Sequence, residues 1–169
     1  MINEIIIRSA SNADIKEIAK MQINALKSDD FNQFYHSIMN LFIKEFEKRW
    51  KKQINQSTNV MLMLKSNKII GFITYLNSIN SDIKNIYILP SMRRKGLGSM
   101  LCKAVIEELL KSKSKKISVW ILKENNKAKL FFEKLGFKQT LQSRSDDIGH
   151  RVQIKEIQYH LIISECSIQ

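Results

Sequence analysis

Cysteine, proline and glycine are scarce in this chain, and their scarcity excludes several classes of protein. Its 169 residues include two cysteines, one proline and five glycines. Cys102 and Cys166 cannot form the disulfide framework of a small secreted domain, and no metal-ligand spacing connects them with the three histidines. His36, His150 and His160 are therefore interpreted as incidental. We expect a folded protein of a reducing compartment that holds no metal.

Long apolar runs are also missing. No window approaches the roughly 18 uninterrupted apolar residues that cross a bilayer, and residues 1–5 lack the basic start of a signal peptide. Hydrophobic residues make up 44% of the chain and charged residues 26%, which is ordinary for a globular protein. The length of 169 residues fits one domain with a sizeable core. These features predict a cytoplasmic protein with a single domain over residues 1–169 and no membrane contact.

Acidic residues are few in the middle of the chain. The net charge is +12, and residues 93–138 carry 13 basic and 4 acidic groups, a net charge of +9. Such a concentration of positive charge attracts polyanionic ligands. Nucleic acid is one such ligand, although no nucleic-acid-binding motif appears and this interpretation ranks last. A general enrichment in lysine, isoleucine and asparagine is the alternative explanation for any single lysine.

Hydrophobic periodicity predicts alternating strands and helices. Strands are expected at residues 4–8, 60–64, 69–76, 83–89, 117–122, 137–141 and 154–163. Helices are expected at residues 15–26, 31–50, 100–110 and 125–135. A hairpin turn is predicted at residues 65–68, and a polar loop through Asp146, Asp147 and Gly149. This order is typical of a mixed α/β domain around one twisted sheet.

The scarce proline and two of the five glycines occur together in residues 88–99. This segment leaves an apolar strand, passes through Pro90 and reaches Gly96 and Gly98 where a helical pattern begins. A glycine loop before a helix directs free backbone N–H groups and the positive end of the helix dipole at one point. Three cations surround that point: Arg93, Arg94 and Lys95. The segment predicts a diphosphate-binding loop, and a basic turn that merely contains glycines is the alternative.

A second motif lies about 26 residues downstream of the loop. It consists of Asn125 and Ala128, followed by Phe132-Glu133-Lys134-Leu135-Gly136-Phe137. Together with Arg93-Arg94-Lys95-Gly96-Leu97-Gly98, and with a strand–helix–strand pattern between them, it resembles the GNAT-type N-acetyltransferase superfamily. The resemblance covers nearly the whole chain. It implies one N-acetyltransferase domain, with a twisted, mostly antiparallel sheet whose central strands splay apart between flanking helices.

The resemblance also implies a ligand and the residues that bind it. Acetyl-CoA would be the co-substrate, and its pyrophosphate would bind the backbone amides of residues 94–99. The pantetheine arm would pair with the edge of strand 83–89, and the Ile88 amide would face the thioester carbonyl, an oxyanion-type role. The implied cofactor-binding residues are Ile88, Leu89, Arg93, Arg94, Lys95, Gly96, Leu97, Gly98, Ser99, Asn125 and Phe132.

Two positions bear on catalysis. Asp82 stands where some family members have a glutamate general base, and its shorter side chain would need a bridging water; a plain turn residue in Asn80-Ser81-Asp82 is the alternative. Phe132 stands where the family usually has a tyrosine that protonates the leaving thiolate, which a phenyl ring cannot do. Water or the Tyr87 hydroxyl would substitute. Asn125 either bonds the pantetheine or caps its helix.

The acceptor is expected to be a primary amine of a small molecule or a protein. In the family, the link between the first two helices borders the acceptor pocket, so Phe31 and Tyr35 are candidate substrate contacts; core packing is the alternative. The resemblance to the family also suggests a homodimer. The rival function is a non-catalytic acyl-CoA-binding regulatory module, which the phenylalanine at position 132 favours.

Overall fold

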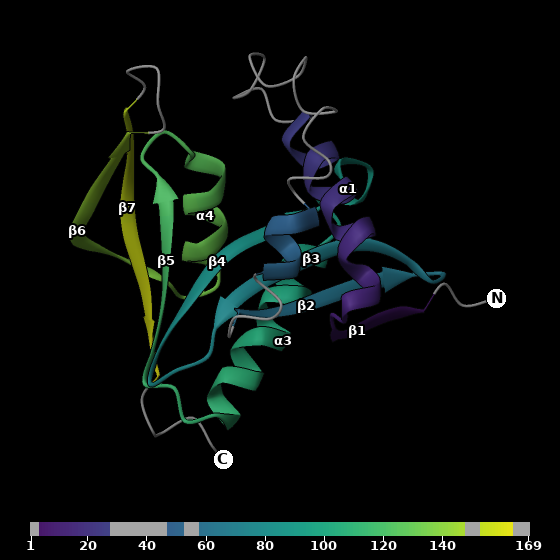
Figure 1. Ribbon diagram of the computed structural model, residues 1–169. Coiled ribbons are helices and arrows are strands. Elements are labelled where there is room, and N and C mark those ends of the chain that lie inside the picture. Colours follow the sequence, from purple (N-terminus) through teal and green to yellow (C-terminus); the bar gives the residue numbers. More distant parts are fainter. Residues whose placement is uncertain (1–3, 28–46, 53–57, 148–152, 164–169) are drawn as a thin grey trace. The chain divides into compact units, whose positions relative to one another are not determined.

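The computed structural model describes residues 4–27, 47–52, 58–147 and 153–163. Its strands form a seven-stranded sheet in the order β1-β2-β3-β4-β5-β7-β6 (Figure 1). The elements are β1 (Ile5–Ser9), α1 (Ile15–Lys27), β2 (Thr58–Lys65), β3 (Lys68–Leu76), β4 (Asn80–Ile88), α3 (Leu97–Lys111), β5 (Lys116–Leu122), α4 (Asn126–Lys134), β6 (Lys138–Asp147) and β7 (Gln153–Ile162). The predicted mixed α/β class, with a mostly antiparallel sheet and flanking helices, is confirmed.

The chain divides into two compact units. The first contains residues 1–76 and 85–105, and the second contains residues 77–84 and 106–169. In the first unit, β1 pairs antiparallel with β2, and β2 pairs antiparallel with β3. Ser66 and Asn67 form the β2–β3 turn with φ values of 49° and 61°. Two left-handed residues match the right-handed twist of a tight hairpin, so the predicted turn is confirmed.

The core of the first unit lies between α1 and the β2–β3 hairpin. Ile18, Ala19 and Met21 of α1 pack with buried side chains of the two strands. Trp50, from the helical residues 47–52, is 2% exposed and meets Phe72 edge-to-face at 5.2 Å. Trp50 therefore belongs to the core of the first unit. Most of the predicted second helix, including Phe31 and Tyr35, lies outside the described residues.

An ion pair joins the end of β1 to the start of α1. The guanidinium of Arg8 donates two hydrogen bonds to Asp14, at 2.9 and 2.7 Å. Asp14 also accepts hydrogen bonds from the backbone N–H and the hydroxyl of Ser11, at 2.8 and 2.9 Å. The hydrogen bonds from Arg8, and secondarily those from Ser11, hold the pKa of Asp14 well below its usual range.

This lowered pKa predicts acid-dependent stability. The ionised Asp14 stabilises the fold above the pKa of the unfolded chain, about 4, and its contribution is lost as the pH falls through the folded value. We expect Asp14→Asn to lower the free energy of unfolding by about 1–2 kcal/mol at pH 7. The difference from the wild type should shrink steadily below pH 4. Urea denaturation at pH 7, 5 and 3 measures it; a difference that does not vary with pH would contradict the assignment.

The second unit contains the first half of β4 together with β5, β7 and β6. β4 and β5 pair in parallel from Asn80 with Lys116 to Ile83 with Val119, and both strands continue beyond this ladder. β7 pairs antiparallel with β5 and with β6. The predicted polar loop at Asp146 and Asp147 is wrong: β6 extends through both residues. An edge strand with one solvent face accepts polar side chains as long as its backbone pairs with a neighbour, here β7.

Helix α4 ends as the sequence predicts, at Gly136. This glycine has a φ of 89° and donates its N–H to the Glu133 carbonyl at 2.9 Å, while Phe137 N–H donates to the Phe132 carbonyl at 3.1 Å. These two bonds are a Schellman cap. Cys102 is buried in α3, and burial raises the pKa of its thiol to about 12. No helix within the described ranges is long and apolar enough to span a membrane.

Candidate functional site

The glycine loop begins where β4 ends, in the first unit. Ile88 is 9% exposed, and the next residue, Leu89, donates its N–H to the Ile70 carbonyl of β3 at 2.9 Å. A 3₁₀ turn then spans Pro90–Met92. The bond to β3 therefore anchors the strand end, and the proline turn redirects the chain toward α3.

Two residues of the loop adopt left-handed backbone conformations. Arg94 has a φ of 62° and Gly96 a φ of 76°. The left-handed region is costly for most residues and free for glycine. A Cβ at Gly96 would also meet no atom within 4 Å. The surface over Gly96 is therefore open, and a ligand can approach its backbone closely.

Unpaired backbone donors follow Gly96. The first helical hydrogen bond of α3 runs from Met100 N–H to the Gly96 carbonyl at 3.0 Å. The N–H groups of Leu97, Gly98 and Ser99 precede that bond and have no acceptor among the described residues. These N–H groups lie at the N-terminal end of α3, a 15-residue helix, where the helix dipole is positive. This arrangement of donors suits a phosphate group.

The three cations of the loop differ in their surroundings. Arg93 is half-buried and donates from Nε to the Ile88 carbonyl at 3.1 Å, so it braces the end of β4. Lys95 is exposed and donates to the Ser91 carbonyl at 3.1 Å. Arg94 is exposed as well. Arg94 and Lys95 therefore supply positive charge at the surface of the loop.

A close approach between β3 and β4 fixes the backbone just before the loop. A Cβ at Gly71 would lie 2.5 Å from Ile88 Cδ1 and 3.0 Å from the Tyr87 carbonyl oxygen. Only glycine fits there without displacing its neighbours. Gly71 therefore allows β3 to approach the Tyr87–Ile88 end of β4 closely.

The second motif lies in the second unit and forms helix α4. The Asn125 Oδ1 accepts a hydrogen bond from Ala128 N–H at 3.0 Å, which makes Asn125 the N-cap residue. Phe132 is 3% exposed and meets Phe131 and Phe137 edge-to-face, with ring centroids 5.0 and 5.2 Å apart. The structure thus gives Asn125 a capping role and Phe132 a place in the core of its unit.

The cap predicts a specific loss of stability. Asn125→Ala leaves the Ala128 N–H without its partner, and we expect the free energy of unfolding to fall by about 0.5–2 kcal/mol. Asn125→Ser keeps a capping oxygen and should retain most of that stability. Urea denaturation measures both variants, and CoA titration shows whether the side chain has a second role. Equal stability of the alanine and serine variants would contradict the capping role.

Asp82 lies within strand β4. The interpretation of Asn80-Ser81-Asp82 as a plain turn is wrong, because all three residues pair with β5 in the parallel ladder. One carboxylate oxygen, Oδ2, forms an ion pair with Lys84. The other, Oδ1, is buried without a hydrogen-bond partner, the only side-chain atom of this kind in the described part of the chain. Asp82 is thus an incompletely satisfied carboxylate inside a sheet.

The strand register brings two further polar residues next to Asp82 that the sequence did not single out. Ser118 of β5 pairs with Asp82, and His160 of β7 pairs with Ser118. No sequence motif links these residues, since 36 and 42 positions separate consecutive members. The interpretation of His160 as incidental follows from the lack of metal-ligand spacing in the sequence, and only the strand register reveals its polar neighbours.

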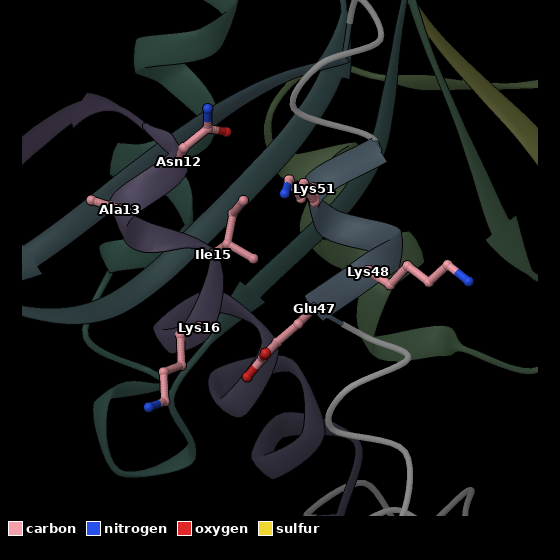
Figure 2. Close-up of a pocket in the computed structure, with 7 residues that line it drawn as sticks. All are labelled: Asn12, Ala13, Ile15, Lys16, Glu47, Lys48 and Lys51. Carbon is pink, nitrogen blue, oxygen red and sulfur yellow. The ribbon is translucent and has the colours of Figure 1, made fainter.

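A separate depression lies in the first unit, between the start of α1 and the helical residues 47–52 (Figure 2). It has a volume of about 600 Å³ and includes no residue of the glycine loop. Figure 2 shows the side chains of Ile15 and Lys51 pointing toward one another and that of Lys48 pointing away. Its lining residues are Asn12, Ala13, Ile15, Lys16, Glu47, Lys48 and Lys51.

Several solved structures of other proteins share this fold. A PaiA N-acetyltransferase from Thermoplasma acidophilum, solved in complex with coenzyme A, is 17% identical, with a TM-score of 0.73 and coverage of 95% of this chain and 99% of that one. A GNAT-family acetyltransferase from Streptococcus pneumoniae is 22% identical, with a TM-score of 0.73 and coverage of 95% and 100%. YncA from Salmonella typhimurium, solved with its cofactor acetyl-CoA, is 16% identical, with a TM-score of 0.72 and coverage of 98% of each chain.

A family model connects the fold with an activity. The model described as an acetyltransferase (GNAT) domain matches residues 9–153, which include the glycine loop, Asp82 and the second motif. The match covers well over half of the chain, so the resemblance predicted from the two motifs is confirmed. The chain therefore belongs to the GNAT family of acetyltransferases, and it is an acyltransferase whose co-substrate is acetyl-CoA.

Proposed function

We propose that this enzyme transfers the acetyl group of acetyl-CoA to a primary amine. The observation that carries the proposal is the row of free N–H groups after Gly96, at the start of α3, with open space above the glycine. A diphosphate needs such donors and such access. The PaiA and YncA structures, solved with coenzyme A and acetyl-CoA, add support.

The residues of the loop have distinct roles in this proposal. The amides of residues 94–99 hold the pyrophosphate, and the exposed Arg94 and Lys95 attract the additional ribose phosphate. The Ile88 amide donates to the thioester carbonyl oxygen, where negative charge develops. Bound acetyl-CoA supplies an acetyl group activated as a thioester.

The amine must lose a proton before it attacks, because an ammonium group has no lone pair. Asp82 is the proposed base, since its Oδ1 has no hydrogen-bond partner within the described residues. Phe132 offers no proton to the leaving thiolate. A thiol of ordinary acidity, with a pKa near about 8.5, leaves without a strong acid, so turnover does not require one.

A non-catalytic acyl-CoA-binding regulatory module is the second candidate. The observation that favours it is the phenylalanine at position 132, buried at 3% exposure where the family usually has a tyrosine. Such a module would bind acetyl-CoA but release no thiol when an amine is added.

An acceptor screen tests the proposal. The chain is incubated with acetyl-CoA and a panel of amines that includes amino acids, polyamines, aminoglycosides and peptides with free N-termini, and thiol release is followed. We expect saturable, acceptor-dependent release, weakest for polycationic amines because the net charge of the chain is +12. Saturable binding of acetyl-CoA without release for any amine would support the regulatory module. The homodimer and the cytoplasmic location remain proposals, and gel filtration and cell fractionation test them.

A further inference from the structure

One face of the sheet in the second unit carries a polar row that crosses three strands. Asp82 of β4 pairs with Ser118 of β5, and Ser118 pairs with His160 of β7. Residues that pair across neighbouring strands direct their side chains to the same face, with their Cβ atoms about 5 Å apart. The three side chains are therefore neighbours in the order Asp82, Ser118, His160.

The opposite face of the same strands is apolar. Ile83, Ile117, Val119 and Tyr159 alternate with the row and are at most 4% exposed. The row itself is partly shielded, because Ser118 is 7% exposed while Asp82 and His160 are half-buried. No hydrogen bond joins these three side chains within the described residues, and the half-buried ends leave the row accessible to water.

Asp82 is the member of the row whose hydrogen bonding is incomplete. Its Oδ1 is buried and has no partner within the described residues, whereas its Oδ2 pairs with Lys84. Burial of a polar atom without a hydrogen bond is unfavourable, and such an atom in a native fold requires an explanation. Ser118 carries the hydroxyl nearest to it by register, and either rotation of that hydroxyl or one bridging water connects the two.

The charged groups on this face set the electrostatic conditions of the row. Lys84 on β4 faces Asp82, and Lys116 on β5 lies two residues from Ser118 on the same face. On β6, Lys138 pairs with His160. Glu156 of β7 is bound to Arg144 of β6 at 2.5 Å, and that guanidinium lies 4.5 Å from the centre of the Trp120 ring. The imidazole of His160 has two ring nitrogens, so it can accept a proton on one and release a proton from the other.

We propose that Ser118 and His160 carry the proton away from Asp82 during acetyl transfer. This inference rests on the proposed function, with Asp82 as the base. The Asp82 carboxylate takes a proton from the ammonium group of the acceptor, which frees the amine lone pair. The Ser118 hydroxyl then accepts that proton on its oxygen and passes its own to a ring nitrogen of His160. The imidazolium releases a proton to water, so one proton moves and the row returns to its starting state.

Ser118 and His160 are positioning residues in this scheme, because they act through Asp82. The experiment measures kcat, KM and the pH profile of kcat/KM with an acceptor that the wild type uses. We expect His160→Gln and Ser118→Ala each to lower kcat about tenfold or more, with both KM values unchanged within about twofold. Ser118→Thr keeps a hydroxyl and should restore most of kcat. The pH profile of kcat/KM for His160→Gln should also differ in shape from that of the wild type.

A matched control uses the same face of β7. Gln158→Ala removes a side chain two residues from His160 that pairs with Trp120 and lies outside the row. It should leave kcat and the pH profile unchanged. The thermal unfolding temperature of every variant is also measured, so that a loss of acetyl transfer can be distinguished from a loss of the folded structure. The NMR resonances of the His160 ring should shift in the Asp82→Asn variant and remain unchanged in the Gln158→Ala variant. This measurement does not depend on enzyme activity.

Three outcomes distinguish the inference from the proposed function. If Asp82→Asn loses transfer while Ser118→Ala and His160→Gln keep wild-type kcat and pH profile, the proton path is overturned and the proposed function stands. If the NMR resonances of the His160 ring do not shift in Asp82→Asn, the proposed coupling between Asp82 and His160 is overturned. If the wild type shows no acceptor-dependent thiol release, the proposed function fails and the proton path fails with it.

Discussion

Replacement of Gly96 by aspartate is expected to abolish CoA binding while the fold is preserved. Gly96 has a φ of 76°, and a side chain added there would extend into the open space above the unpaired amides. A carboxylate in that space repels a diphosphate and competes for the same N–H donors. We expect the Kd for CoA to rise at least about 100-fold, equivalent to about 2.7 kcal/mol. Isothermal titration calorimetry measures it, and circular dichroism verifies the fold.

The matched control at this position is Gly96→Asn. Asparagine has nearly the same shape as aspartate, carries no charge and tolerates the left-handed conformation. Its Kd should rise about tenfold or less, so the difference between the two variants isolates the effect of charge. Normal CoA binding by Gly96→Asp would show that the ligand binds elsewhere, and the loop assignment would be rejected.

Replacement of Gly71 by alanine is expected to impair both stability and transfer, although this residue is not part of the loop. The new methyl group would lie 2.5 Å from Ile88 Cδ1 and 3.0 Å from the Tyr87 carbonyl oxygen, so the Ile88 side chain must rotate away and the Tyr87 carbonyl must yield by a few tenths of an ångström. Overpacking of this kind costs about 1–3 kcal/mol. A displacement of about 1 Å near reacting groups lowers rates by as much as about 100-fold. We expect kcat/KM for acetyl-CoA to fall about 10- to 100-fold, measured by thiol release.

A double-mutant cycle assigns this effect to the contact itself. Ile88→Val removes the Cδ1 atom that the new methyl group would meet. The double variant Gly71→Ala, Ile88→Val should therefore be less impaired than the sum of the single variants, with a coupling of about 0.5 kcal/mol or more in the free energy of unfolding. Strict additivity of the two changes would mean that Gly71 acts through something other than the position of Ile88.

The fold and the glycine loop were predictable from the sequence because both depend on local chemistry. Gly136 ends α4 where a glycine after an apolar helical pattern predicts, and Ser66 and Asn67 make the expected tight turn. The second motif was predictable as a helix, while the capping role of Asn125 became visible only in the 3.0 Å hydrogen bond that its Oδ1 accepts from Ala128 N–H. Local propensity, turn residues and periodicity agree at these places, which is why the prediction succeeds.

The errors of prediction arise where pairing with a distant strand overrides local chemistry. Asn80-Ser81-Asp82 reads as a turn, yet its pairing with residues 116–118 of β5 makes it strand. Asp146 and Asp147 read as a loop, yet pairing with β7 extends β6 through them. Polar residues at a sheet edge or on its solvent face resemble loop residues in the sequence, because the backbone partner that stabilises them is not visible there.

The sequence by itself determined the family, the α/β class and the presence of a glycine turn before α3. The two motifs indicate the family, hydrophobic periodicity indicates the class, and the glycines mark the turn, all from patterns within short stretches of sequence. Only the tertiary structure decided which residues accompany Asp82 and how closely Gly71 approaches Ile88. Strand register sets these relations, and a shift of one residue would send each side chain to the other face. Register depends on how distant strands pack together, which no short stretch of sequence specifies.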